Sequence, residues 1–194
     1  MSSSPASGSV GAAVIRPGTP ADAGACADIY TPYVTDSIVS FEEEPPTAEE
    51  MRRRMEAALL WLVAERDHEI CGYAYGSPHR QRAAYRWAAD VAIYMRDEHR
   101  GQGLGRRLYA ELFEGLRARG KCVLCAGVAL PNPASEALHR TLGFTEVGVY
   151  RRIAFKLGRW IDTRWYQLDL CPDQGPPPPL PAERSAGTDG AGLT

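Results

Sequence analysis

Apolar positions along the chain follow two periods, one typical of strands and one typical of helices. Runs typical of buried or half-buried strands occur at 13–17, 61–66, 69–76, 86–96, 122–130, 144–155 and 160–170. The clearest helix covers 103–119, where leucines recur at steps of four and Gly120 supplies a stop signal. Strands and helices therefore alternate along the chain, which predicts a single α/β domain.

Three weaker helices fill the remaining gaps between strands. The first begins at Thr19 or Asp22 and runs through a weakly periodic segment to residue 34. The second begins with a capping box made by Thr47 and Glu50 and carries an apolar face. A short third helix opens at the Asn132-Pro133 pair, since proline is favoured in the first turn of a helix.

Composition places the folded domain at 13–171. The chain has 194 residues, of which 44% are hydrophobic, and this is enough for a sizeable core. The segments 1–12 and 172–194 are rich in Ser, Gly, Ala and Pro, a composition that predicts disordered tails. The PPPPLP run at 176–181 is either a linker-like extension or a polyproline ligand for a partner domain.

Charge and targeting signals narrow the classes of partner. The 22 basic and 24 acidic residues give a formal net charge of -2, which argues against nucleic acid as a partner. The first 13 residues lack the features of a signal peptide, and no apolar run is long enough to span a membrane. We therefore expect a cytoplasmic protein whose five cysteines are thiols. Cys122 and Cys125 belong to one strand and face opposite sides, so a shared metal or redox role is not expected.

The most specific local motif is HRGQGLGRRL at 99–108, a basic, glycine-rich turn before the clearest helix. Glycines let backbone N–H groups approach an anion, and the helix N-terminus adds partial positive charge. A Walker A loop is excluded because Gly105 is followed by Arg106 rather than by Lys and Ser or Thr. A Rossmann loop is excluded because Arg106 occupies the position of its third glycine.

The remaining pattern, Arg100-x-x-Gly103-x-Gly105, resembles the pyrophosphate loop of the GCN5-related N-acetyltransferases (GNAT), and the order of elements matches as well. Within that superfamily, residues 13–170 resemble the phosphinothricin N-acetyltransferases. Four segments carry this resemblance: IYTPYVTDSIVSFEEEPPT at 29–47, RQRAAYRW at 80–87, LPNPASEALHRTLGF at 130–144 and FKLGRWIDTRWYQLDL at 155–170.

The resemblance implies a mixed, mostly antiparallel twisted sheet flanked by about four helices. It also implies a homodimeric, acetyl-CoA-dependent enzyme, with no metal, that acetylates the α-amine of phosphinothricin, methionine sulfoximine or methionine sulfone. Two alternatives stay open: acetylation of another small amine or a protein N-terminus, and a regulatory module that binds acetyl-CoA without turnover.

The resemblance assigns the acetyl-CoA site to the strand at 86–96, the glycine-rich loop and the short helix that opens at Asn132-Pro133. The strand contributes backbone groups to the pantetheine arm, and the loop binds the pyrophosphate. The start of the short helix holds the lower part of the pantetheine arm. The residues implied are Ile93, Tyr94, Met95, Arg100, Gly101, Gln102, Gly103, Leu104, Gly105, Arg106, Asn132 and Ser135.

Two residues are candidates for proton transfer. Asp90 is the single acid in the apolar strand AADVAIYM, and it stands where the family carries a catalytic Glu. Its carboxylate either removes the proton of the substrate ammonium group or forms a salt bridge with Arg80 or Arg82. His139 matches a histidine of the family's short helix, and its ordinary pKa suits proton transfer near neutral pH. Tyr94, as a thiolate protonator, and His79 are weaker candidates.

The substrate site is assigned to the segment before Asp90. Arg80 and Arg82 suit a carboxylate or phosphinate, because a guanidinium can bind such groups through two hydrogen bonds. Tyr85 belongs to the same polar group, and Tyr30 and Phe41 could form further walls of this pocket. Lys156 and Trp160 carry the family signature, with a role either in the scaffold or at the dimer contact.

Overall fold

The computed structural model describes residues 11–171 together with 175, 177 and 180. The predicted tails at 1–12 and 172–194, including PPPPLP, lie almost entirely outside the described residues. Within 11–171 no helix is long and apolar enough to cross a membrane.

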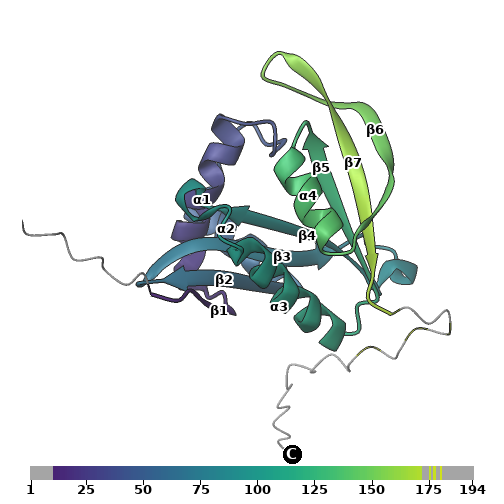
Figure 1. Ribbon diagram of the computed structural model, residues 1–194, viewed down its shortest axis with the longest axis horizontal. Coiled ribbons are helices and arrows are strands. Elements are labelled where there is room, and N and C mark those ends of the chain that lie inside the picture. Colours follow the sequence, from purple (N-terminus) through teal and green to yellow (C-terminus); the bar gives the residue numbers. More distant parts are fainter. Residues whose placement is uncertain (1–10, 172–174, 176, 178–179, 181–194) are drawn as a thin grey trace, which may run out of the picture.

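The described chain forms one twisted sheet with helices on both faces (Figure 1). The strands are β1 Val14–Pro17, β2 Leu60–Arg66, β3 Glu69–Pro78, β4 Ala88–Met95, β5 Val123–Leu130, β6 Thr145–Lys156 and β7 Arg159–Asp169. The α-helices are α1 Ala23–Thr35, α2 Ala48–Ala57, α3 Leu104–Ala118 and α4 Pro133–Thr141. Short 3-10 turns occupy Pro20–Asp22, Ala83–Tyr85 and Asp97–His99. The predicted mixed α/β architecture is confirmed.

Two apolar clusters hold the helices to opposite faces of the sheet. On one face, Leu108, Leu112 and Leu116 of α3 are completely buried against the central strands, as their spacing predicts. On the other face, α1 and α2 pack over Trp61 and Tyr73. Each face is therefore covered by helices that alternate with the strands in sequence.

The strands stand in the order β1-β2-β3-β4-β5-β7-β6, and β4 with β5 is the one parallel pair among them. This pairing is short, with Ala88, Ala89 and Asp90 opposite Val123, Leu124 and Cys125. Beyond Asp90 the two strands diverge, although β4 continues to Met95 and β5 to Leu130. The sheet therefore opens into a wedge whose closed end lies at Asp90 and Cys125.

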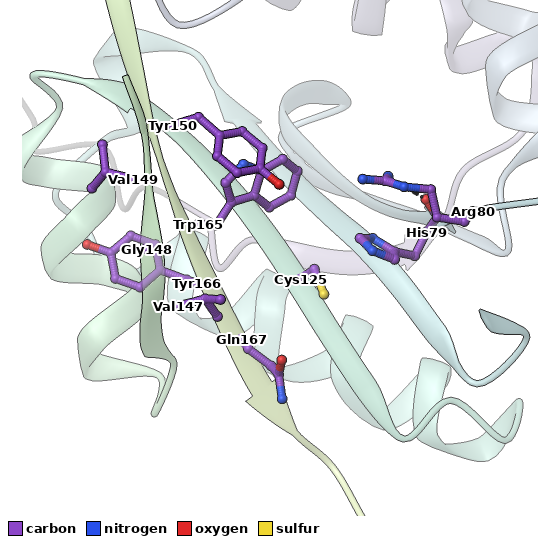
Figure 2. Close-up of a pocket in the computed structure, with 10 residues that line it drawn as sticks. All are labelled: His79, Arg80, Cys125, Val147, Gly148, Val149, Tyr150, Trp165, Tyr166 and Gln167. Atoms are coloured by element: carbon purple, nitrogen blue, oxygen red, sulfur yellow. Dashed lines mark hydrogen bonds between the residues drawn. The ribbon is translucent and has the colours of Figure 1, made fainter. Parts of the chain in front are cut away.

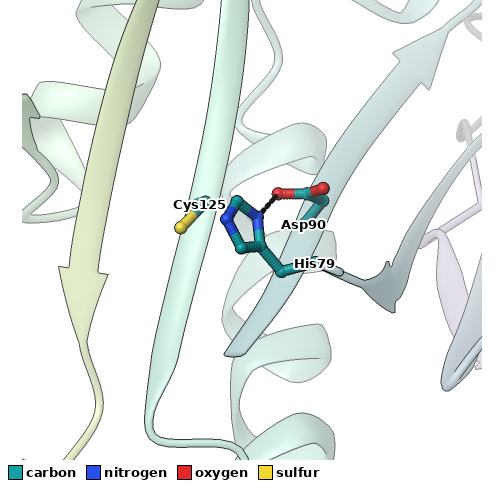
Figure 3. A group of neighbouring side chains, drawn as sticks. All are labelled: His79, Asp90 and Cys125. Carbon is teal, nitrogen blue, oxygen red and sulfur yellow. Dashed lines mark hydrogen bonds and ion pairs between the residues drawn. The ribbon is translucent and has the colours of Figure 1, made fainter. Parts of the chain in front are cut away.

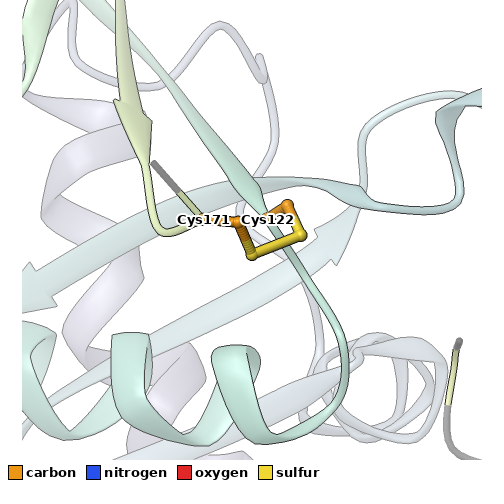
Figure 4. Close-up of a disulfide and its surroundings, with 2 residues drawn as sticks. All are labelled: Cys122 and Cys171. Atoms are coloured by element: carbon orange, nitrogen blue, oxygen red, sulfur yellow. A yellow bond between two sulfur atoms is a disulfide. The ribbon is translucent and has the colours of Figure 1, made fainter. Parts of the chain in front are cut away.

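One sequence prediction about the cysteines is wrong. Cys122 and Cys171 form a disulfide, so the chain does not hold five thiols (Figure 4). The pairing of β5 with β7 brings together two residues 49 positions apart, and Leu170 N–H donates to the Cys122 carbonyl at 2.7 Å. No local spacing signals such a contact. Cys26, Cys71 and Cys125 are free thiols.

Candidate active site

The glycine-rich loop adopts the backbone conformation that its glycines allow. Gly101 and Gly103 have φ values of 72° and 76°, in the left-handed region that L side chains rarely adopt. A Cβ atom built on either residue would meet nothing within 4 Å, so the space over the loop is open. Gly103 is also the residue that precedes the first turn of α3. Backbone N–H groups at this helix start therefore face an accessible volume, as an anion site requires.

A cleft of about 480 Å³, called here the outer cleft, runs from this loop along β4 and α4. Nine of the predicted acetyl-CoA residues line it: Ile93, Met95, Arg100, Gly101, Gly103, Gly105, Arg106, Asn132 and Ser135. Leu104 is instead buried in the core, where only its backbone can serve a ligand. Gln102 points elsewhere, since its side chain bonds the Glu98 carbonyl at 2.8 Å and Arg66 at 3.1 Å.

A smaller cavity of about 60 Å³, the inner cleft, lies between the diverging strands. Its walls come from Val91–Tyr94 on β4 and Gly127–Ala129 on β5. Asn132, Ser135 and Val39 line both clefts. Together the clefts form a groove that follows β4 from the loop into the wedge, where β4 lacks a strand partner on one side.

Asp90 lies at the closed end of the wedge and is bonded to a histidine. Its Oδ1 is 2.7 Å from Nδ1 of His79, whose side chain is 17% exposed (Figure 3). Burial raises the pKa of the Asp90 carboxyl, and the hydrogen bond from His79 opposes that rise. The sequence alternative of a salt bridge from Arg80 or Arg82 is not what the structure shows, because the observed partner is His79.

A third cavity, of about 390 Å³, opens beside His79; we call it the His79 cavity (Figure 2). Its polar lining includes His79, Arg80 and Gln167, and its apolar lining includes Tyr150 and Trp165. Cys125 lies at its floor, on β5. The cavity therefore offers a cation, a histidine and an aromatic wall to a small polar ligand.

The other predicted substrate residues divide into two groups. Tyr85 packs its ring edge against His79, with 5.7 Å between the ring centres, and is thus beside the His79 cavity. Arg82 and Phe41 are exposed and line none of the three cavities described. Tyr30 is buried, and its hydroxyl bonds Ser40 at 2.7 Å and Glu42 at 3.0 Å.

His139 is almost completely buried, with 3% of its surface exposed. Its Nδ1 donates to the Ser135 carbonyl at 2.8 Å, and its ring stacks on Tyr166. Burial lowers the pKa of the imidazole, so the neutral form is favoured. His139 lines the inner cleft, yet its surroundings are those of a packed aromatic side chain.

Tyr94 also lines the inner cleft, and its ring packs edge-on against Tyr30 and Tyr33. Burial raises the pKa of its phenol well above the ordinary value. The hydroxyl therefore keeps its proton at neutral pH and can donate it as a hydrogen bond. Tyr33 in turn bonds both the N–H and the carbonyl of Met95 through its own hydroxyl, which holds the end of β4 against α1.

Sequence reasoning named Arg80 but missed most of the other residues that shape the His79 cavity. His79 was a weak candidate because nothing in the sequence places it beside Asp90; the pairing of β3 with β4 does so, since Ser77 lies opposite Asp90. Cys125, for which the sequence predicts no role, is half-buried in this lining, and burial raises the pKa of its thiol. Ligand-type atoms of His79, Asp90 and Cys125 lie within 4.8 Å of one another, a grouping that the sequence did not predict.

The profile of the acetyltransferase (GNAT) family matches residues 25–144 of this chain. The chain belongs to the GNAT family. The match spans α1 to the end of α4 and so includes the loop, both clefts and Asp90. It confirms the family resemblance and the fold that the motif and the order of elements predict.

Individual GNAT relatives are similar over most of the chain. A phosphinothricin N-acetyltransferase of Streptomyces viridochromogenes is 37% identical over 170 residues, 86% of this chain and 91% of that protein. An L-methionine sulfoximine/L-methionine sulfone acetyltransferase of Salmonella typhimurium is 32% identical over 160 residues, 80% of this chain and 94% of that protein.

Solved GNAT structures agree with the fold. An acetyltransferase from Salmonella typhimurium, solved with its cofactor acetyl-CoA, matches with a TM-score of 0.81 and 30% identity, over 85% of this chain and 98% of that one. A phosphinothricin acetyltransferase from Sinorhizobium meliloti in complex with acetyl-CoA has a TM-score of 0.78 and 35% identity, over 81% and 88% of the two chains. The outer cleft of this GNAT chain suits acetyl-CoA, because it joins an anion-binding loop to an unpaired strand edge.

Proposed function

We propose that this GNAT enzyme transfers the acetyl group of acetyl-CoA to the α-amine of small amino acids of the phosphinothricin, methionine sulfoximine and methionine sulfone type. The names of the relatives and the shape of the site support this substrate class. The observation that carries the proposal is the place of Asp90. Its neighbour Val91 lines the inner cleft, and its bonded partner His79 lines the His79 cavity.

The chain's own residues divide the work of acetyl transfer. Bound acetyl-CoA supplies an activated acyl group as a thioester. The loop N–H groups at Gly103 and Gly105, with Arg100 and Arg106, bind and orient its pyrophosphate. The unpaired edge of β4 at Ile93–Met95 holds the arm that leads toward the wedge. Tyr94 keeps a phenol proton at the inner cleft, where the departing thiolate needs one.

The amine side of the reaction needs a group that accepts a proton. An α-ammonium group carries no lone pair, so one proton must leave before the nitrogen can attack a thioester. Asp90, at the closed end of the wedge, supplies negative charge for this step, and burial raises its pKa toward the range that suits a base. Arg80, in the His79 cavity, suits the carboxylate or phosphinate of the same substrate.

The test is thiol release from acetyl-CoA over a panel of amines. The panel contains phosphinothricin, methionine sulfoximine, methionine sulfone, methionine, a polyamine and a peptide with a free N-terminus. We expect the first three to give the highest kcat/KM. Higher kcat/KM for the polyamine or the peptide would assign another amine class, and no thiol release with any amine would contradict the enzyme assignment. Growth of an expressing strain on phosphinothricin provides an independent readout, namely resistance.

We also propose that the enzyme is a homodimer that meets its second copy through the β6–β7 hairpin. Six of the exposed large apolar side chains of the described chain lie on this hairpin: Val147, Tyr150, Ile153, Phe155, Leu157 and Trp160. Apolar surface gathered in this way is typical of protein interfaces. Phe155→Glu should convert a dimer to a monomer in light scattering, whereas Val14→Glu, at an exposed apolar residue of β1, should not.

A further inference from the structure

The His79 cavity is lined by His79 and not by Asp90, although Asp90 is the acid of the site. Asp90 also lines neither the outer nor the inner cleft. A ligand in the His79 cavity therefore contacts the imidazole, whereas the Asp90 carboxylate, although its side chain is 31% exposed, is not part of the cavity lining. This arrangement bears on how a proton leaves the amine.

The hydrogen bond between the two residues decides which imidazole nitrogen is free. An ionised carboxylate can only accept, so Nδ1 of His79 carries the proton of the 2.7 Å bond to Asp90 Oδ1. The other nitrogen, Nε2, then has an unshared pair of electrons. Figure 3 shows Nε2 on the side of the ring turned away from Asp90 and toward Cys125. A neutral imidazole held in this tautomer is a proton acceptor aimed away from its carboxylate.

We propose that His79 is a catalytic residue of this enzyme and that its Nε2 takes the proton of the substrate amine, while Asp90 holds the ring and stabilises the imidazolium. The proposal rests on the proposed function and adds a residue to it. The ammonium group loses two protons in all. One passes to Nε2 and on to solvent, and the other neutralises the thiolate as the C–N bond forms and the C–S bond breaks.

Distances along the sheet are compatible with this route. Cys125 lines the His79 cavity and Gly127 lines the inner cleft, and they are two residues apart on the same face of β5. That separation is about 7 Å along a strand. An amine bound at His79 is therefore within the length of a small amino acid of the inner cleft, where the thioester is expected.

The charged and titratable groups that face His79 come from four elements. Asp90 belongs to β4, Cys125 to β5, Tyr85 to the 3-10 turn and Arg80 to the segment after β3. Arg80 also acts on Asp90 electrostatically, and its attraction opposes the effect of burial on the Asp90 pKa. The negative charge of Asp90 therefore stabilises the His79 imidazolium, whereas the positive charge of Arg80 opposes its formation.

The experiment compares His79→Asn with wild type and with His68→Asn. The amide of Asn can still donate to Asp90 but has no titratable nitrogen, so the scaffold bond is kept and the acceptor is removed. We expect kcat/KM for the amine to fall about 10²- to 10⁴-fold. The acidic limb of its pH profile should change, and the affinity for acetyl-CoA should stay unaltered. His68 is fully exposed, faces Glu65 at 3.8 Å and has a φ of 66°, which Asn tolerates, so His68→Asn should behave as wild type.

Chemical rescue and nuclear magnetic resonance complete the test. Added imidazole should restore part of the activity of His79→Ala and none of that of Asp90→Asn. The ¹⁵N signals of the His79 ring should show the proton on Nδ1 in wild type and a changed tautomer balance in Asp90→Asn, a result that needs no turnover. Wild-type rates in His79→Asn would show that Asp90 acts alone, and a wild-type ring protonated on Nε2 rather than Nδ1 would show that the pair is not formed. Loss of wild-type activity in EDTA would assign the imidazole to a metal and overturn the proposal as well.

The failure of this inference is distinct from failure of the proposed function. An active wild-type enzyme with an equally active His79→Asn variant refutes only the role of His79. A wild-type enzyme that acetylates no amine of the panel refutes the proposed function, and the role of His79 falls with it.

Discussion

At the scale of single residues, the mechanism depends most on the carboxylate at position 90. Asp90→Asn should lower turnover about 10²- to 10⁴-fold, the usual effect of losing acid–base assistance, while acetyl-CoA affinity stays unchanged. The loss should be largest at low pH and should shrink as pH approaches the pKa of the amine, because free amine then needs no base. Turnover of wild type and variant between pH 6 and 10, with calorimetric titration of acetyl-CoA, measures both effects.

The complementary substitution is Asp90→Glu. A longer side chain keeps the charge but displaces His79, so the variant should retain activity with an altered pH profile. Equal rates for wild type and Asp90→Asn at every pH would contradict any role of this carboxylate in proton transfer.

The two arginines predicted to bind the substrate give a second residue-scale prediction. Arg80 lines the His79 cavity and Arg82 is an exposed candidate from the sequence. Arg80→Ala should raise the KM for the amino acid and leave the KM for acetyl-CoA unchanged, because a charge-assisted pair to the substrate anion is lost. Arg82→Ala, in the same steady-state assay, tests whether Arg82 rather than Arg80 binds the substrate anion. A change confined to the acetyl-CoA KM would place the residue concerned on the cofactor side.

Residue-level reasoning from the sequence located the acid but not its partner. Asp90 stands out because a lone acid in an apolar strand needs a reason to be buried. His79 does not stand out, because it follows a strand end and its partner lies eleven residues away on the neighbouring strand. The aromatic wall of Tyr150 and Trp165 was missed for the same reason, since only the pairing of β6 with β7 brings these rings within 5.9 Å.

At the scale of elements, the loop before α3 gives a sharp test. Gly103→Val should weaken acetyl-CoA binding at least tenfold, because a branched side chain at this φ distorts the loop and covers its N–H groups. Gly158→Val is the matched control, with a φ of 73° and equally open space, in the turn between β6 and β7. Both variants should lose similar stability, and only Gly103→Val should lose affinity in calorimetry. Wild-type affinity in Gly103→Val would refute the loop assignment.

A second element-scale prediction concerns the ion pair that joins β1 to the start of α1. Arg16 donates to both carboxylate oxygens of Asp22 at 2.8 Å and to Glu65 on β2 at 2.7 Å. The hydrogen bond from Arg16 lowers the pKa of Asp22 to about 2, from an ordinary value of 3.8. The carboxylate therefore stabilises the fold above about pH 4, and this contribution disappears as pH falls through 2.

Asp22→Asn should therefore lower the free energy of unfolding by about 2 kcal/mol at pH 7, with a gap that closes below pH 4. Urea denaturation at pH 7, 4 and 2.5 measures this difference. The exposed residue Glu49 supplies the control, since Glu49→Gln should change stability little at any of these values. A pH-independent gap for Asp22→Asn would mean that the side chain acts through packing alone.

Most elements could be predicted because their signals are local. The leucines of α3, the proline that opens α4 and the alternation of β7 each act over a few neighbouring residues. The observed bounds of α3 and β7, and the start of α4, differ from the predicted ones by about one residue. The divergence of β4 from β5 has no such signal. It arises because the parallel pairing stops at Asp90, a property of two strands distant in sequence.

At the scale of the whole molecule, the Cys122–Cys171 disulfide joins residues 49 positions apart and closes a loop that contains β5, α4, β6 and β7. Crosslinking a loop of this size reduces the entropy of the unfolded chain, so reduction should lower the free energy of unfolding by about 2–4 kcal/mol. Cys171→Ser should lose the same stability and should no longer respond to reductant. Thiol titration of the unfolded wild-type chain should give three thiols before reduction and five after it.

The same disulfide fixes where the described chain leaves the domain. Cys171 is tied to the start of β5, at the closed end of the wedge, whereas the loop at Gly101 and Gly103 follows the far end of β4. The eight residues of β4 put about 25 Å between these two ends. A surface anchor or fluorescent label held close to Cys171 would therefore leave the mouth of the outer cleft uncovered. Immobilised in that orientation, the enzyme should bind acetyl-CoA from solution as readily as the free protein does.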